Sequence, residues 1–192
     1  MKRRLPLLAL LITVVFPAKS SFATGDLDEV MRLLAMRQHG RVEFVDQQFL
    51  AALKHPLESM GEMRYDAPDR LEKRTLKPRP ESVLLEGGML TVERGHSRRV
   101  VELRSYPQLL PFIESIRATL AGDRAALERV FHVEFAGSID RWTLTLVPLD
   151  RQIAKYAVQV QIVGAADQLR QVDIRQADGD RSRMTLRPIA AP

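Results

Sequence analysis

Few side chains in this sequence have the types and spacing that catalysis or metal binding requires. The four histidines, His39, His55, His96 and His132, show no H-x-x-x-H or H-E-x-x-H spacing. A G-x-S-x-G elbow, a phosphate-binding loop and a G-x-G-x-x-G fingerprint are all missing. The segment 178–180, Asp-Gly-Asp, lacks the remaining ligands of a calcium loop and is better explained as a hairpin turn. The sequence therefore predicts a non-enzyme with no catalytic residue, metal or cofactor.

The most concentrated charge is basic and lies around one proline-rich turn. Its members are Arg70, Lys73, Arg74, Lys77 and Arg79. One interpretation is a solvated face whose positive charge is partly offset by nearby glutamates. The other is a surface that docks an acidic partner or lipid headgroups. Elsewhere both signs of charge are interspersed, so the high pI of the chain does not indicate nucleic-acid binding.

Residues 1–23 have the features of a secretory signal peptide. A basic start, Met1-Lys2-Arg3-Arg4, is followed by an apolar run over residues 5–16 and by the small-residue ending Ser21-Phe22-Ala23. The alternative is a membrane anchor, but the run is shorter than the roughly 20 residues that span a bilayer. We expect cleavage after Ala23 and a soluble periplasmic product, residues 24–192, held by its core alone because it has no cysteine.

The remaining chain reads as one domain made mainly of short strands. Residues 57–93 form a meander in which apolar and polar residues alternate, interrupted by turns at 66–69, at the prolines 78 and 80 and at Gly87-Gly88. Apolar residues at helical spacing predict helices over 26–39 and 109–120, with a shorter one up to about 131. The helix at 26–39 should begin with a capping box at Asp26 and end before Gly40. About eleven strands and three helical segments favour a curved antiparallel sheet with helices on one face, a mainly β (α+β) fold.

The order of turns and strands resembles the periplasmic outer-membrane lipoprotein carrier family, the LolA-like proteins. The family shows a helix before the first strand, a Gly-led strand ending in a proline turn, a second strand and proline, and then an acidic-Gly strand pair. The matching residues here are Gly61-Glu62-Met63-Arg64-Tyr65, Pro68, Leu71 to Thr75, Pro78 and Glu86-Gly87-Gly88-Met89-Leu90.

The resemblance implies an unclosed antiparallel β-barrel whose concave apolar face is covered by helices acting as a lid. It also implies a monomeric carrier that takes lipoprotein acyl chains, or a related lipid, from an inner-membrane exporter to an outer-membrane acceptor. Two departures stand out. Many carriers place an arginine that tethers the lid where this chain has Ala67, and their aromatic-rich strand is represented here by Leu71 and Lys73. A lysine on the concave side suggests a ligand with an acidic group; alternatively, the side chain of Lys73 simply extends to solvent.

The resemblance and the alternating pattern together predict the residues of a ligand site. The expected cavity wall is Met63, Tyr65, Leu71, Lys73, Leu85, Leu90, Val92, Phe135, Trp142, Leu144 and Leu146. The expected lid is Leu27, Val30, Met31, Leu34, Phe112, Ile113 and Ile116. The same side chains could instead be ordinary packed core, and the alternative function is then a periplasmic scaffold or interaction protein of envelope assembly with a filled interior.

Overall fold

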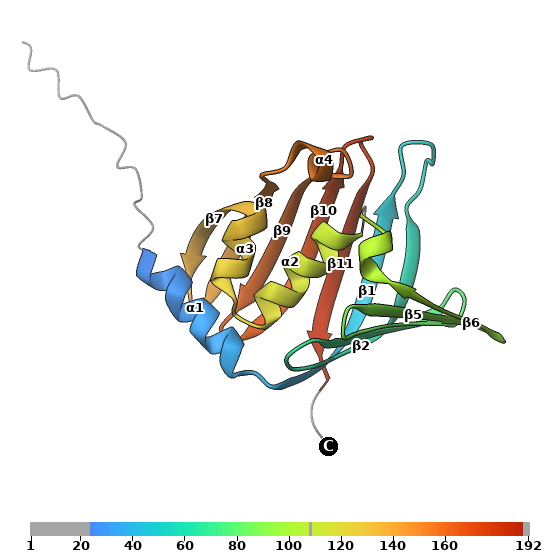
Figure 1. Ribbon diagram of the computed structural model, residues 1–192, viewed down its shortest axis with the longest axis horizontal. Helices are drawn as coiled ribbons and strands as arrows, with labels where there is room; N and C mark the ends of the chain where they lie inside the picture. The colour runs from blue at the N-terminus through green and yellow to red at the C-terminus, as the bar shows by residue number, and fades with distance from the viewer. Residues whose placement is uncertain (1–23, 108, 190–192) are drawn as a thin grey trace, which may run out of the picture.

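The computed structural model describes residues 24–107 and 109–189, which form one eleven-stranded antiparallel sheet with four α-helices (Figure 1). The helices are α1 (Thr24–Met36), α2 (Leu110–Leu120), α3 (Arg124–Val130) and α4 (Arg151–Ala154), and a 3-10 turn, η1, covers Leu103–Ser105. The strands are β1 (His39–Phe49), β2 (Leu57–Asp66), β3 (Arg70–Lys77), β4 (Glu81–Glu86), β5 (Met89–Arg94), β6 (Ser97–Glu102), β7 (Phe131–Ser138), β8 (Arg141–Pro148), β9 (Ala157–Ala165), β10 (Gln168–Gln176) and β11 (Arg181–Pro188).

The strands follow the order β6-β5-β4-β3-β2-β1-β11-β10-β9-β8-β7, so the sheet ends at β6 and β7 rather than closing on itself. This confirms the predicted open antiparallel fold with helices on one face. Almost every connection is a hairpin. At the predicted Gly87-Gly88 turn both residues have positive φ, 57° and 75°, as a type I′ turn requires.

The pairing of β2 with β3 is irregular at Gly61, where the two backbones approach closely. The register of the two strands shifts between Met60 and Gly61, and a Cβ on Gly61 would lie 2.0 Å from the carbonyl oxygen of Arg74. Only a residue without a side chain fits there. In Figure 1, α1, α2 and α3 cover the part of the sheet formed by β7 to β11, while β5 and β6 lie at the other end of the sheet, at a steep angle to β1 and β11.

Two apolar clusters fill the space between sheet and helices. The larger one packs α1, α2 and α3 against residues of β1 and β7 to β11, including Trp142, which is fully buried. The smaller one joins Leu85 and Leu90 to Leu103. Helix α2 contacts both, with Phe112, Ile116 and Leu120 on the large cluster and Leu110 and Ile113 on the small one. It is therefore the element that spans the two halves of the concave face.

Two local predictions differ from the structure, and one short helix is not predicted by the sequence. Helix α1 begins at Thr24, which leaves Asp26 inside its first turn rather than at its cap. The helix ends at Met36, and Gly40 belongs to β1 instead of following the helix directly. Helix α4 was not predicted, because only four residues adopt it and Asp150 caps it from the preceding strand end.

The predicted signal peptide, with its cleavage point after Ala23, lies outside the described residues. Among the described helices, none combines the length and apolarity needed to cross a membrane.

Candidate functional site

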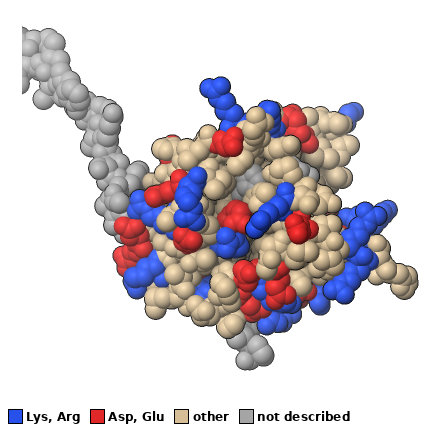
Figure 2. Space-filling model, viewed as in Figure 1, with Lys and Arg blue, Asp and Glu red and all other residues tan. Residues whose placement is uncertain are grey.

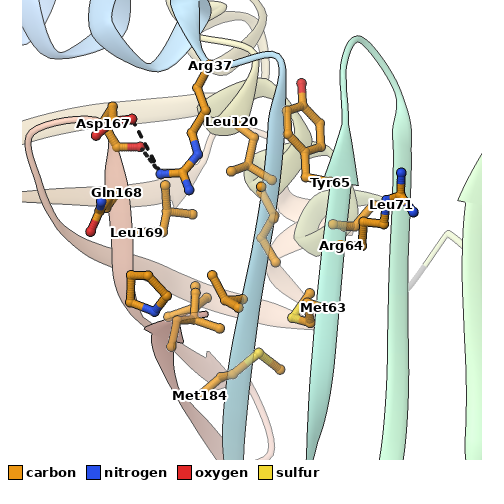
Figure 3. A pocket seen from close by; sticks show the side chains of 16 residues that line it. Arg37, Met63, Arg64, Tyr65, Leu71, Leu120, Asp167, Gln168, Leu169 and Met184 are labelled. Carbon is orange, nitrogen blue, oxygen red and sulfur yellow. Dashed lines mark hydrogen bonds and ion pairs between the residues drawn. The ribbon is translucent and has the colours of Figure 1, made fainter. Parts of the chain in front are cut away.

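A small apolar cavity lies between α2 and the concave face of the sheet. Its volume is about 60 Å³, which is room for only a few water molecules. Side chains from β1, β2, β3, β10, β11 and α2 surround it, and Arg37, Asp167 and Gln168 stand together at one end, its mouth (Figure 3). The apolar lining is Val42, Met63, Tyr65, Leu71, Ile116, Leu120, Leu169, Val172, Met184, Leu186 and Pro188, and Arg64, which lies beside Leu71, completes the polar lining.

Side chains alternate between the two faces of each strand, so every second residue contributes to the sheet side of the cavity wall. Val42 on β1 stands opposite Met63 on β2 and Pro188 on β11, so three strands present apolar atoms at one level. The helix side comes from Ile116 and Leu120, which are four residues apart and therefore lie on one face of α2. A sheet and a helix that each have one apolar face thus enclose the cavity between them.

Tyr65 has its ring in the cavity wall and its hydroxyl directed to the turn after β2. The hydroxyl is 3.4 Å from the carbonyl oxygen of Pro68. Burial raises the pKa of Tyr65, and the nearby guanidinium of Arg117 partly offsets this effect. The phenol therefore stays neutral and contributes an apolar surface.

Arg37 and Asp167 form the charged part of the mouth. Arg37 follows α1, and its Nη1 lies 3.2 Å from the backbone oxygen and 3.4 Å from the carboxylate of Asp167, in the turn between β9 and β10. Its Nε donates to the carbonyl oxygen of His39 at 3.2 Å. These bonds tie the end of α1 to a distant turn across the opening, as Figure 3 shows.

The predicted wall residues fall in three places. Three of them, Met63, Tyr65 and Leu71, line the cavity. A second group, Leu85, Leu90 and Val92, belongs to the small cluster beneath the start of α2. A third group, Phe135, Trp142, Leu144 and Leu146, packs in the large cluster, where the last three are fully buried. For all three groups, a role in binding a ligand stays a prediction, because helices cover these residues in the structure.

Lys73 lies on the concave side, as predicted, but it already has a partner. Its Nζ is 3.4 Å from a carboxylate oxygen of Asp46 and 4.7 Å from the ring centre of Phe44. Asp46 is only 3% exposed and also accepts a hydrogen bond from Ser182 at 2.8 Å. An intramolecular ion pair therefore neutralises the lysine that suggested an acidic ligand.

The predicted lid residues all point toward the interior. Leu27, Val30, Met31 and Leu34 of α1 are buried in the large cluster, and the three on α2 are partly buried in one cluster or the other. Helix α1 also touches the turn between α2 and α3 at Gly122, where a Cβ would lie 2.1 Å from the backbone oxygen of Met31. The two lid helices are thus packed directly on each other.

The basic residues around the β3–β4 turn do not form one surface. Lys73 faces inward, while Arg70 and Arg74 pair with Glu86 and Glu72 at 2.9 and 3.2 Å. In Figure 2 both signs of charge are mixed over the helices, and lysine and arginine gather toward the side where Figure 1 places β5 and β6. Across residues 24–107 and 109–189, no group of three His, Cys, Asp or Glu could hold a metal ion.

Sequence reasoning missed several residues of the cavity. Val42, Val172, Met184 and Leu186 occupy alternating positions of strands that were predicted, so their pattern could have identified them. Arg37 and Asp167 carry no such signal, because they are far apart in sequence and meet only through the fold.

A family model described as "Outer membrane lipoprotein carrier protein LolA-like" matches residues 19–191. The chain belongs to this family. The match covers all eleven strands and the helices that cover the sheet, which agrees with the predicted resemblance.

Solved structures with a similar course of the chain come from several bacteria. A LolA superfamily protein from Nitrosomonas europaea is 12% identical, covers 88% of this chain and 94% of its own, and has a TM-score of 0.47. The Pseudomonas aeruginosa MucA/MucB complex contains a chain that is 16% identical, with 87% and 58% covered and a TM-score of 0.48. The Mycobacterium tuberculosis lipoprotein LppX is 10% identical, with 88% and 100% covered and a TM-score of 0.46. The curated proteins contain no match.

Proposed function

We propose that this LolA-like protein is a periplasmic carrier without catalytic activity. It binds acyl chains of lipoproteins, or of a related outer-membrane lipid, beneath α2 and carries them from an inner-membrane exporter to an outer-membrane acceptor. The observation that carries the proposal is the apolar cavity between α2 and an open sheet, in a chain of the lipoprotein carrier-like family.

The task demands a sheltered apolar space. Exposing an acyl chain to water costs about 0.8 kcal/mol for each CH₂, or on the order of 11 kcal/mol for a chain of about 14 carbons. Pockets that enclose ligands of moderate size have volumes of about 300–1,000 Å³. A cavity of about 60 Å³ is too small for such a chain, so cargo must displace a lid to be taken up.

Helix α2 is the element best suited to move. Its polar side chains bond within the helix: Ser115 donates to the carbonyl oxygen of Phe112, Thr119 donates to that of Ser115, and Arg117 pairs with Glu114. Contact with the sheet is then mainly apolar, through residues such as Ile116 and Leu120. Acyl chains can replace such contacts without leaving a buried polar group unpaired.

One observation favours the alternative of a periplasmic scaffold with a filled core. Trp142, Leu144 and Leu146 have no solvent exposure, and the indole nitrogen of Trp142 donates to the carbonyl oxygen of Ala166 at 3.0 Å. The half of the concave face beneath α1 and α3 is thus already packed. A scaffold would keep that packing, whereas a carrier exchanges part of it for lipid.

The test is lipid extraction from protein exported to the periplasm of a Gram-negative host. We expect solvent extracts of the purified protein to contain acylated species by mass spectrometry. Met184→Trp, which fills the cavity, should reduce the amount, whereas Thr185→Trp, on the exposed face of the same strand, should not. Absence of lipid, together with no uptake of a fluorescent acyl probe, would support the scaffold instead. Amino-terminal sequencing of the same protein checks cleavage after Ala23.

A further inference from the structure

The mouth of the cavity holds a half-buried cation beside an apolar lining. The Arg37 side chain is 22% exposed, whereas the side chain of its partner Asp167 is 41% exposed. Carboxylates and guanidinium groups lose hydration when they are covered, so an anion next to a half-buried arginine stabilises it. Asp167 supplies that anion from a turn at the surface.

The arginine is held in place by the backbone as well as by its partner. Nε donates to the carbonyl oxygen of His39, and Nη1 donates to the backbone oxygen of Asp167. The guanidinium group also lies against β1 at Gly40, where a Cβ would approach Nε to 3.3 Å. These contacts remain if the carboxylate of Asp167 turns away, so the cation keeps its position.

The carboxylate contact is the weakest of these attachments. It measures 3.4 Å, against 2.6 Å for the pairs Arg117–Glu114 and Arg124–Glu128. Charge-assisted hydrogen bonds are normally about 2.7–2.9 Å long. A more exposed aspartate at longer range can be exchanged for another anion, and arginine binds carboxylate and phosphate groups with two parallel bonds.

We propose that Arg37 anchors the headgroup of the cargo, and that the cavity takes an amphiphile with one anionic group, carboxylate or phosphate, at the end of an acyl chain. This inference rests on the proposed carrier function. The acyl chain lies between α2 and the sheet, and the anionic group replaces the carboxylate of Asp167 at Nη1 of Arg37. The cation that selects cargo is therefore Arg37 rather than Lys73, whose charge Asp46 already neutralises.

The test compares ligands that share a tail and differ in the headgroup. The full mature protein is loaded with N-phenyl-1-naphthylamine, an uncharged fluorescent probe, which is then displaced by hexadecanoate, hexadecyl phosphate or hexadecanol. We expect at least one of the two anionic ligands to bind about tenfold more tightly than the alcohol, as one charge-assisted hydrogen bond predicts. Comparing the two anions tells which headgroup the site prefers.

Single-residue variants then test which residue causes the preference for an anionic headgroup. Arg37→Gln should abolish the difference in affinity between the preferred anion and hexadecanol, and circular dichroism together with urea unfolding shows whether the variant is folded. Asp167→Asn should strengthen binding of the preferred anion by a few-fold, because the competing carboxylate is gone. Arg41→Gln, on the outer face of β1 and paired with Glu62, is the control and should behave as wild type.

Two results would count against the proposal in different ways. If wild type binds hexadecanol as tightly as both anions, or if Arg37→Gln keeps the preference, the headgroup site is wrong and the carrier function stands. If neither the probe nor any of the three ligands binds, the carrier function itself fails. Inorganic phosphate alone should not displace the probe, because it has no tail to occupy the apolar cavity.

Discussion

Replacing Gly122 with alanine tests whether the two lid helices are packed as one unit. Gly122 has φ of 64°, and its missing side chain lets the turn between α2 and α3 approach α1. A Cβ would lie 2.1 Å from the backbone oxygen of Met31 and 2.8 Å from the Cβ of Ala35. Neither contact can be relieved by rotating a side chain, so α1 must shift away from the turn.

The expected cost has two parts. A side chain at positive φ costs about 1 kcal/mol, and forcing an extra group into a packed contact costs about 1–3 kcal/mol more. Gly122→Ala should therefore lower the free energy of unfolding by about 2–4 kcal/mol. Gly95→Ala is the matched control, because Gly95 has φ of 57° but nothing within 4 Å of the added Cβ; it should lose only about 1 kcal/mol.

Urea unfolding followed by tryptophan fluorescence measures both variants, since Trp142 lies in the cluster that α1 covers. We also expect Gly122→Ala to take up an acyl probe faster than wild type, because α1 holds α2 less firmly. Equal losses of stability in the two variants would refute the reasoning, since they would show that α1 does not pack against this turn in solution.

Two further changes test the electrostatics of the sheet. Lys73→Met leaves Asp46 buried without its cation and should destabilise the fold by about 3 kcal/mol. The double variant Lys73→Met/Asp46→Asn should recover much of this loss, because the buried negative charge is gone as well. Urea unfolding measures both variants, and a double variant less stable than Lys73→Met would contradict this account of the ion pair. The hydrogen bond with His39, together with Arg64, lowers the pKa of Asp66 from its usual 3.8. The ionised carboxylate of Asp66 therefore stabilises the folded state at pH values above 3.8, and this stabilisation is lost as the pH falls through the lower pKa of the folded protein. Thermal unfolding at a series of acidic pH values should therefore show a smaller acid loss for Asp66→Asn than for wild type, and identical pH profiles would rule out this coupling.

The strands and hairpins of this chain could be predicted because their causes are local. Alternating side chains over 57–65 and 70–76 gave β2 and β3, and the glycine pair at 87 and 88 gave the turn between β4 and β5. The end of α1 was placed too far along the chain, because Gly40 has a different use: it leaves room for the guanidinium of Arg37 rather than ending a helix. Nothing in the local pattern distinguishes these two reasons for a glycine.

The candidate site was predictable only in part, for the same reason. Alternation identified which residues of a strand face inward, so Met63, Tyr65 and Leu71 were placed correctly on the concave side. It could not show that helices cover Trp142 and Leu144, or that Asp46 neutralises Lys73. Those facts depend on how the sheet curves and on where α2 crosses it.

By itself, the sequence determined the kind of protein: a cysteine-free, mostly antiparallel β domain with amphipathic helices and no catalytic or metal-binding motif. Side-chain periodicity and turn chemistry act between neighbours in the chain, so they can be read without coordinates. The tertiary structure alone decided that β3 approaches the backbone of β2 closely at Gly61, that α2 bridges two apolar clusters, and that Arg37 meets Asp167 at the mouth of the cavity. Contacts between residues that are far apart in sequence are set by the packing of whole elements, which no local pattern encodes.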